Sequence, residues 1–148
     1  MKRIEELHHL SHDHHHGLLV CWKIRTAFSK GIEIERVKDY LNWFYDYHLK
    51  SHFEIEEATL LTVVGSEHEY GKQMLEEHQQ LRELFENQEV SSGNLVEIEE
   101  LLQAHIRFEE RALFPLIQDI ATIEQLKAIA AADSEEKFID SESDAFWL

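Results

Sequence analysis

Hydrophobic residues recur along most of the chain at the spacing of α-helices, and no segment alternates with the period of two that marks a half-buried strand. Few glycines and a single proline interrupt this pattern, and they divide it into four long helical segments, at about 4–29, 33–63, 67–87 and 95–118. The loops between these segments are short, so consecutive helices are expected to lie antiparallel. The pattern therefore predicts an all-α fold, an up-down-up-down four-helix bundle.

The C-terminal part of the chain has a different character. A shorter helix is expected from Thr122 to about Ala132, and the residues after it are acidic and end in Phe146-Trp147-Leu148. We expect residues 122–148 to form a short C-terminal helix and a partly ordered acidic tail whose aromatic end docks on the bundle. A length of 148 residues is that of one domain, so the prediction is a single domain over residues 1–148 with the bundle at about 4–118.

One arrangement of acids and histidines is written twice along the chain. Asp13-His14 lies in the first helical segment and Glu77-His78 in the third. The second and fourth segments each carry His-x-x-x-Glu-Glu, at 52–57 and 105–110. The spacing between the two motifs differs between the copies by about three helical turns, so the motif-bearing faces keep their phase. The chain is therefore expected to build one site from two related halves.

The helical period decides which histidines face the interior. At about 100° per residue, one histidine of each helix falls on the apolar stripe of that helix, namely His14, His52, His78 and His105. Glu56 and Glu109 follow His52 and His105 by one turn and also face inward. His48, one turn before His52, is expected on the same side. All four helices thus direct an imidazole toward the bundle axis.

Burying four imidazoles and two carboxylates in an apolar core is costly unless they are paired, hydrogen-bonded or bound to metal. A metal pair supplies the missing positive charge, with Glu56 and Glu109 as bridging carboxylates and two histidines for each ion. Oxygen and imidazole ligands suit iron, manganese or zinc. An alternative without metal is a buried ion-pair network in which Arg25 and Arg82 neutralise the two glutamates.

Composition narrows the classes of partner. Fourteen Lys and Arg against thirty Asp and Glu give a formal charge of −16, which repels nucleic acid and anionic membranes. The apolar run 17–22 is too short to span a bilayer. A lone cysteine, Cys21, excludes an internal disulfide and a zinc site built from several cysteines, and it suits a reducing cytoplasm. We expect a soluble cytoplasmic protein with no nucleic-acid or membrane partner.

A second group of histidines lies on the outer side of the first helix. The chain has eleven histidines, and six of them fall between His8 and His16. His8, His12 and His16 form a stripe at the spacing i, i+4 and i+8, away from the apolar face that carries His14. Such a stripe is able to chelate a transition metal.

The motifs at 52–57 and at 105–115, where the second reads His-Ile-Arg-Phe-Glu-Glu-Arg-Ala-Leu-Phe-Pro, resemble those of the haemerythrin-like, HHE cation-binding family, and the resemblance covers about 7–118. It implies a non-haem di-iron site with two iron ions, in which zinc or manganese is also possible. Carried over position by position, it implies six metal ligands: His14, His52, Glu56, His78, His105 and Glu109.

The sequence departs from the oxygen-carrying haemerythrins at two positions of the motif. Met74 stands one turn before His78, where those proteins have a histidine, and the fourth helix has HxxxE in place of HxxxxD. One ion therefore has one histidine fewer. His48 is a candidate for an additional ligand, or for a side chain that hydrogen-bonds a ligand.

The resemblance implies three classes of function. The first is binding of a small diatomic ligand, oxygen or nitric oxide, for sensing, storage or delivery, and it favours a protein that is not an enzyme. The second is a di-iron oxidoreductase that consumes oxygen, peroxide or nitric oxide. The third is a module that handles or senses iron.

Overall fold

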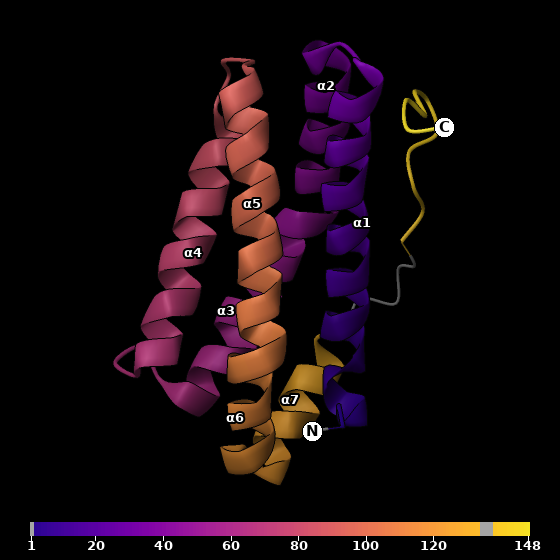
Figure 1. Cartoon of the computed structure of the whole chain (residues 1–148). Coiled ribbons are helices and arrows are strands. Elements are labelled where there is room, and N and C mark those ends of the chain that lie inside the picture. The colour runs from indigo at the N-terminus through magenta and orange to yellow at the C-terminus, as the bar shows by residue number, and fades with distance from the viewer. Residues whose placement is uncertain (1, 134–137) are drawn as a thin grey trace.

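The structure, a computed structural model, describes residues 2–133 and 138–148, and every regular element in these ranges is helical (Figure 1). In chain order the elements are η1 (Glu5–Leu7), α1 (His8–Lys30), α2 (Ile34–Phe44), η2 (Tyr45–Leu49), α3 (Lys50–Val64), α4 (Glu69–Glu86), α5 (Ser92–Phe108), η3 (Glu109–Leu113), α6 (Phe114–Ile120) and α7 (Ile123–Ala131). The all-α prediction is confirmed for these residues. None of their helices is both long enough and apolar enough to cross a membrane.

Four helical segments account for most of the chain, and their bounds agree with the predicted ones to within a few residues. α2, η2 and α3 follow one another without a break, as do α5, η3 and α6. Local signals set the ends: Gly31 closes α1 in the left-handed region at φ 67°, and the Ser91 hydroxyl accepts a hydrogen bond from the Asn94 amide at the start of α5. Thr122 forms a capping box with Gln125, which begins the predicted C-terminal helix α7.

Two five-residue π-helical turns interrupt the long segments, and the sequence pattern did not predict them. η2 ends shortly before His52, and η3 begins at Glu109. A π-helical turn is wider than an α-helical one, so it shifts the direction of the side chains on either side of it. η2 therefore precedes the motif at 52–57, and η3 includes the two glutamates of the motif at 105–110.

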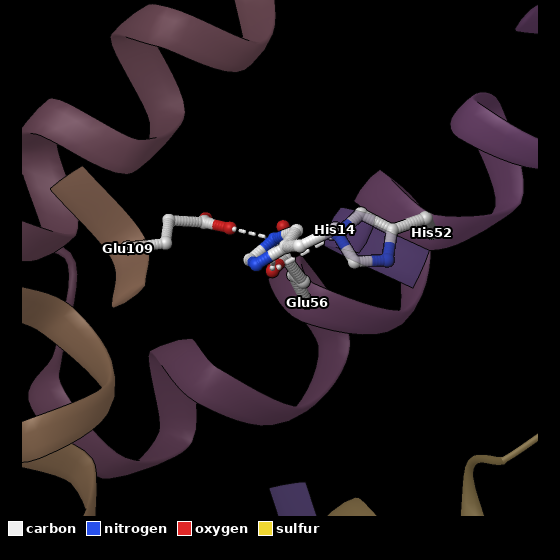
Figure 2. A group of neighbouring side chains, drawn as sticks. All are labelled: His14, His52, Glu56 and Glu109. Carbon is white, nitrogen blue, oxygen red and sulfur yellow. Dashed lines mark hydrogen bonds and ion pairs between the residues drawn. The ribbon is translucent and has the colours of Figure 1, made fainter. Parts of the chain in front are cut away.

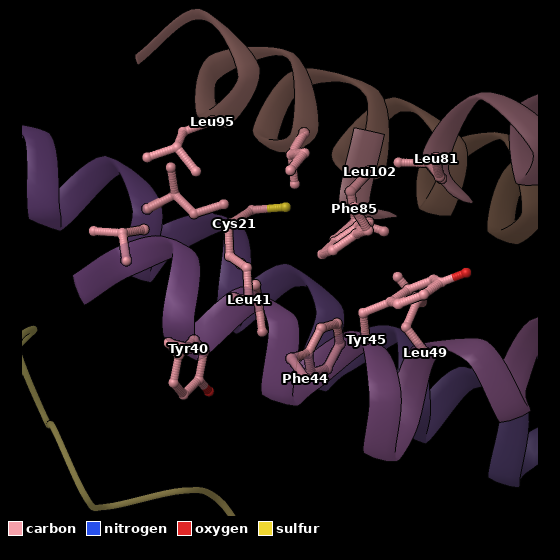
Figure 3. Packing of buried hydrophobic residues seen from close by; sticks show 14 of the residues in the cluster. Cys21, Tyr40, Leu41, Phe44, Tyr45, Leu49, Leu81, Phe85, Leu95 and Leu102 are labelled. Carbon is pink, nitrogen blue, oxygen red and sulfur yellow. The ribbon is translucent and has the colours of Figure 1, made fainter. Parts of the chain in front are cut away.

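The core consists of two apolar clusters. α1 lies beside α5, and α4 lies against both α3 and α5 (Figure 1). The larger cluster fills the space among α1, α2, α4 and α5 (Figure 3). It includes Cys21, whose thiol pKa is raised to about 12 by burial, so the group stays protonated. The smaller cluster joins the ends of α1 and α3 to α6 and α7. Phe53 of the larger cluster stacks on His78, and Phe114 of the smaller one stacks on His14.

The described end of the tail, 138–148, runs along α1 (Figure 1). Asp140 accepts a hydrogen bond from the Tyr40 hydroxyl at 2.6 Å and pairs with the buried Lys23. Arg36 binds Asp144 through two hydrogen bonds, and Phe146 is buried in the larger cluster. Docking of the aromatic end is confirmed, and the part of the predicted tail at 134–137 lies outside the described residues.

Close backbone approach between α3 and α4 makes Gly71 a sensitive position. A Cβ added there would lie 2.2 Å from the Gly65 carbonyl oxygen, so the backbone would have to shift, which costs more than moving a flexible side chain. We predict that Gly71→Ala lowers the free energy of unfolding by about 1–3 kcal/mol in urea titrations.

The matched control is Gly93→Ala in the first turn of α5, where an added Cβ meets no atom within 4 Å. This variant is expected to leave stability unchanged or to raise it by about 0.5–1 kcal/mol, since alanine favours a helix. Equal stability of the two variants would contradict the packing described here.

Candidate metal centre

The six predicted site residues come together in the interior between the helices. Two overlapping groups form, each with its donor atoms within 4.8 Å of one another. One group comprises His14, His52, Glu56 and Glu109 (Figure 2), and the other comprises Glu56, His78, His105 and Glu109. The two glutamates are common to both groups. The structure thus places two sets of two imidazoles and two carboxylates side by side.

Each helical segment contributes to these groups. His14 comes from α1, His52 and Glu56 from α3, and His78 from α4. His105 is near the end of α5, and Glu109 opens η3 one turn later. Both glutamates are completely shielded from solvent, with 0% of their surface exposed, and all four histidines are buried. Phe53 stacks on His78 at 4.1 Å and Phe114 on His14 at 5.2 Å, so the polar centre lies between the two apolar clusters.

The Nε2 atoms of the four imidazoles lie close to the carboxylates of the two glutamates. His14 Nε2 lies 2.8 Å from Glu109 Oε1, and His78 Nε2 lies 3.1 Å from Glu56 Oε1. His52 Nε2 and Glu56 Oε2 are 3.1 Å apart, and His105 Nε2 and Glu109 Oε2 are 3.2 Å apart. These last two contacts lack hydrogen-bond geometry, and all four of their atoms are buried without a hydrogen-bond partner. The unpaired donor atoms therefore occur as one pair in each half of the centre.

The Nδ1 atoms of the four imidazoles are bound by a second set of carboxylates. In each case a carboxylate from a neighbouring helical segment binds the histidine Nδ1: Asp13 binds His52 at 2.9 Å, Glu57 binds His78 at 2.6 Å, Glu77 binds His105 at 2.7 Å and Glu110 binds His14 at 2.6 Å. A carboxylate on one ring nitrogen fixes the ring orientation and makes the other nitrogen a better ligand. All four Nε2 atoms are therefore directed into the centre.

Sequence reasoning noted these four acids but gave them no role. Their signal is adjacency: Asp13 and Glu77 precede an inner histidine, and Glu57 and Glu110 follow an inner glutamate. Adjacent helical residues point about 100° apart. An acid next to an inward residue is thus turned sideways, toward the histidine of the neighbouring helix.

The predicted ion-pair network, in which Arg25 and Arg82 neutralise the two inner glutamates, is wrong. Arg25 pairs with Glu99, and Arg82 pairs with Glu57 at 2.9 Å, so neither guanidinium reaches Glu56 or Glu109. The helical period places both arginines near inward faces, but it does not show that their long side chains pair with other acids, Glu99 and Glu57. The inner glutamates are surrounded by imidazoles.

His48 also differs from its predicted position. It is absent from both donor groups, and its ring lies 4.4 Å from that of Phe138 and 5.0 Å from that of Trp43. The prediction assumed an uninterrupted α-helical phase from His48 to His52, whereas His48 lies within the π-helical turn η2, which ends at Leu49. His48 therefore lines a cavity beside the centre and belongs to neither donor group.

Charge pairing inside the centre shifts the pKa of every member. Burial opposes protonation of the histidines, but the neighbouring carboxylates outweigh it and raise the pKa of His52 to about 9 and those of His14 and His78 well above the usual range. Burial and the nearby Glu109 oppose ionisation of Glu56, yet its histidine partners lower its pKa to about 2. The metal-free centre thus compensates its buried carboxylates with protons on the histidines.

A cavity of about 110 Å³ leads to one side of the centre. His14, His52 and His105 of the centre line it, together with Asp13, Tyr47, His48 and Phe138. A small molecule or ion is therefore able to approach the histidines of the centre from the side where α1, η2 and the tail meet.

Comparison with sequence families agrees with this geometry. A family model described as "Hemerythrin HHE cation binding domain" matches residues 4–117. The chain belongs to this family, and the resemblance drawn from the motifs is confirmed. Searches of curated proteins and of solved structures found no significant match. The residues of the two donor groups all lie within the matched range.

The pKa shifts predict how the stability of the metal-free protein depends on pH. Histidines with a raised folded-state pKa stabilise the fold fully below their unfolded value, about 6.5, and this contribution is lost as the pH rises through about 9. We predict that the melting temperature of chelator-treated protein falls between pH 6.5 and 9.5, with a loss on the order of 3 kcal/mol from His52 alone.

Circular dichroism melts across this pH range test the prediction. In His52→Gln the decline should become smaller, because one titrating group has been removed. A melting temperature that rises from pH 6.5 to 9.5 would mean that the histidines are neutral in the folded metal-free protein.

Proposed function

We propose that this protein holds two metal ions, most suitably iron, in a dinuclear centre whose ligands are His14, His52, Glu56, His78, His105 and Glu109. The observation that carries the proposal is the pair of donor groups with both glutamates in common. A carboxylate has two oxygens and is therefore able to bind one ion on each side. Glu56 and Glu109 would bridge the ions, with two imidazoles completing the protein ligands of each.

The residues present fit such a pair. Four buried atoms of the centre lack a hydrogen-bond partner, namely the Nε2 atoms of His52 and His105 and one carboxylate oxygen each of Glu56 and Glu109. Buried polar atoms of this kind are rare unless water or an ion satisfies them. Imidazole and carboxylate donors without thiolates suit iron, manganese or zinc. Membership of a cation-binding family supports the same assignment.

The surrounding residues orient the ligands and limit access to them. The outer carboxylates Asp13, Glu57, Glu77 and Glu110 fix the imidazole rings through Nδ1. Phe53 and Phe114 stack on two of the histidines and keep bulk water from them on those sides. The cavity beside His14 and His52 gives a small molecule a path to the centre. When bound, a di-iron pair supplies coordination positions and redox electrons for such a molecule.

The function that we infer is binding of a small diatomic ligand, oxygen or nitric oxide, for sensing, storage or delivery. An up-down-up-down four-helix bundle in a single cytoplasmic domain is part of this proposal. The small volume of the cavity supports a ligand of few atoms, because it leaves little room for an organic substrate.

Replacement of the shared glutamates tests the ligand set. We predict about two irons per chain in the wild-type protein, and a fall to one or none in Glu56→Gln and in Glu109→Gln, because each ion loses a charged ligand. Metal analysis of protein without a histidine tag measures this ratio. The matched control is Glu54→Gln, an exposed glutamate on the same helix as Glu56. Wild-type stoichiometry in both inner variants would refute the ligand set.

Absorption spectra of the reduced, iron-loaded protein distinguish the possible activities. We expect a new absorption band on exposure to oxygen or nitric oxide that disappears when the gas is removed. Continuous consumption of oxygen, peroxide or nitric oxide would instead mean that the centre is an oxidoreductase, and ready loss of iron to a chelator would indicate iron handling.

A further inference from the structure

His12 and His16 form a pair on the exposed side of α1. Their Nε2 atoms are 3.2 Å apart, and their rings meet edge to face with centroids 4.7 Å apart. His8 is not part of the pair, because its Nε2 lies 3.0 Å from the Arg3 carbonyl oxygen. The predicted three-histidine stripe is therefore reduced to two imidazoles whose Nε2 atoms lie within hydrogen-bond distance of each other.

The separation of the two nitrogens fits two ligands of one metal ion. Imidazole nitrogens bind first-row dications at about 2.0–2.1 Å, and two such ligands at angles between about 90° and 110° lie about 3 Å apart. A pair of neutral imidazoles also reaches this distance when one ring N–H donates to the other ring nitrogen. These two states differ in whether a metal ion binds, which is measurable.

The ring of His16 is held in place before any ion arrives. It stacks on Phe138 with centroids 4.0 Å apart and an angle of 16° between the rings. Phe138 belongs to the tail, which Asp140 anchors to Lys23 and Tyr40. Fixing a side chain in advance lowers the entropy lost on binding, so a held imidazole is a better ligand than a free surface histidine.

The pair also lies beside the path to the interior. His16 lines the same cavity as Asp13, His14 and His52, and Asp13 is in turn hydrogen-bonded to His52. The formal charge of −16 raises the concentration of cations near the surface. A cation bound by His12 and His16 is therefore positioned beside a cavity that three of the candidate metal ligands, His14, His52 and His105, also line.

We propose that His12 and His16 form a separate, mononuclear site for a divalent transition-metal ion, and that this outer site captures ions that pass along the cavity to the inner centre. The capture role rests on the proposed function of the inner centre, whereas binding at the outer pair does not. Imidazole ligands suit Fe²⁺, Ni²⁺, Cu²⁺ and Zn²⁺.

Nickel titration of the iron-loaded full chain tests the site itself. Isothermal titration calorimetry should show one Ni²⁺ per chain, with the affinity weakened at least about tenfold in His12→Ala and in His16→Ala. His12 is exposed and is not part of the His16–Phe138 stack, so its replacement is expected to preserve the fold. The matched control, His15→Ala, removes a neighbouring exposed histidine and should bind as the wild type does. Equal affinity in all four proteins would overturn the proposal and mean adventitious binding only.

The capture role has its own measurement, the rate at which metal-free protein takes up Fe²⁺ under anaerobic conditions. We expect the double variant His12→Ala/His16→Ala to load about tenfold more slowly than the wild type, at the low end of what local concentration adds to an association rate. The final iron content of its inner centre should equal that of the wild type. Loading at the wild-type rate would refute capture. A wild-type chain that never binds two irons would refute the inner centre, while leaving the nickel result intact.

Discussion

The structure depends on the burial of two carboxylates, Glu56 and Glu109, at the point where the helices meet. Each is fully shielded from solvent, and moving an isolated carboxylate into such a place costs several kcal/mol even after relaxation. Four imidazoles surround the pair, and the carboxylates raise the pKa of each histidine, which favours its protonated form in the metal-free protein. A metal pair would neutralise the same two carboxylates. The interior therefore stabilises positive charge, either as protons on the histidines or as metal ions.

The outer carboxylates connect the helices in a closed ring. Asp13 on α1 binds the histidine of α3, Glu57 on α3 binds that of α4, Glu77 on α4 binds that of α5, and Glu110 on η3 returns to α1. Each segment thus supplies one imidazole to the centre and one acid to the next segment's imidazole. This arrangement explains the repeated motif. In each segment, one histidine or glutamate that faces the centre is followed or preceded by an acid that binds the histidine of a neighbouring segment. The apolar clusters on either side hold the spacing on which all these contacts depend.

The sequence was sufficient for the helices and for the residues that meet in the centre, because both follow from the helical period. His14, His52, His78 and His105 each lie on an apolar stripe, and the structure brings them together. The helical period alone did not predict side-chain positions where the helix is irregular or where the side chain is long. The turn η2 displaces His48, and Arg25 pairs with Glu99 and not with an inner glutamate. Tail contacts such as Phe138 on His16 were likewise beyond periodic reasoning, because they join residues distant in sequence through side-chain shape.

The most direct test of the account is the position of iron in crystals of the iron-loaded protein, located by anomalous diffraction at the iron edge. Two peaks should appear within about 4 Å of each other, the separation typical of dinuclear sites. Both should lie between Glu56 and Glu109, with one beside His14 and His52 and the other beside His78 and His105. A single peak in this interior, or no peak there while iron binds elsewhere, would contradict the claim that the two glutamates are shared by a metal pair.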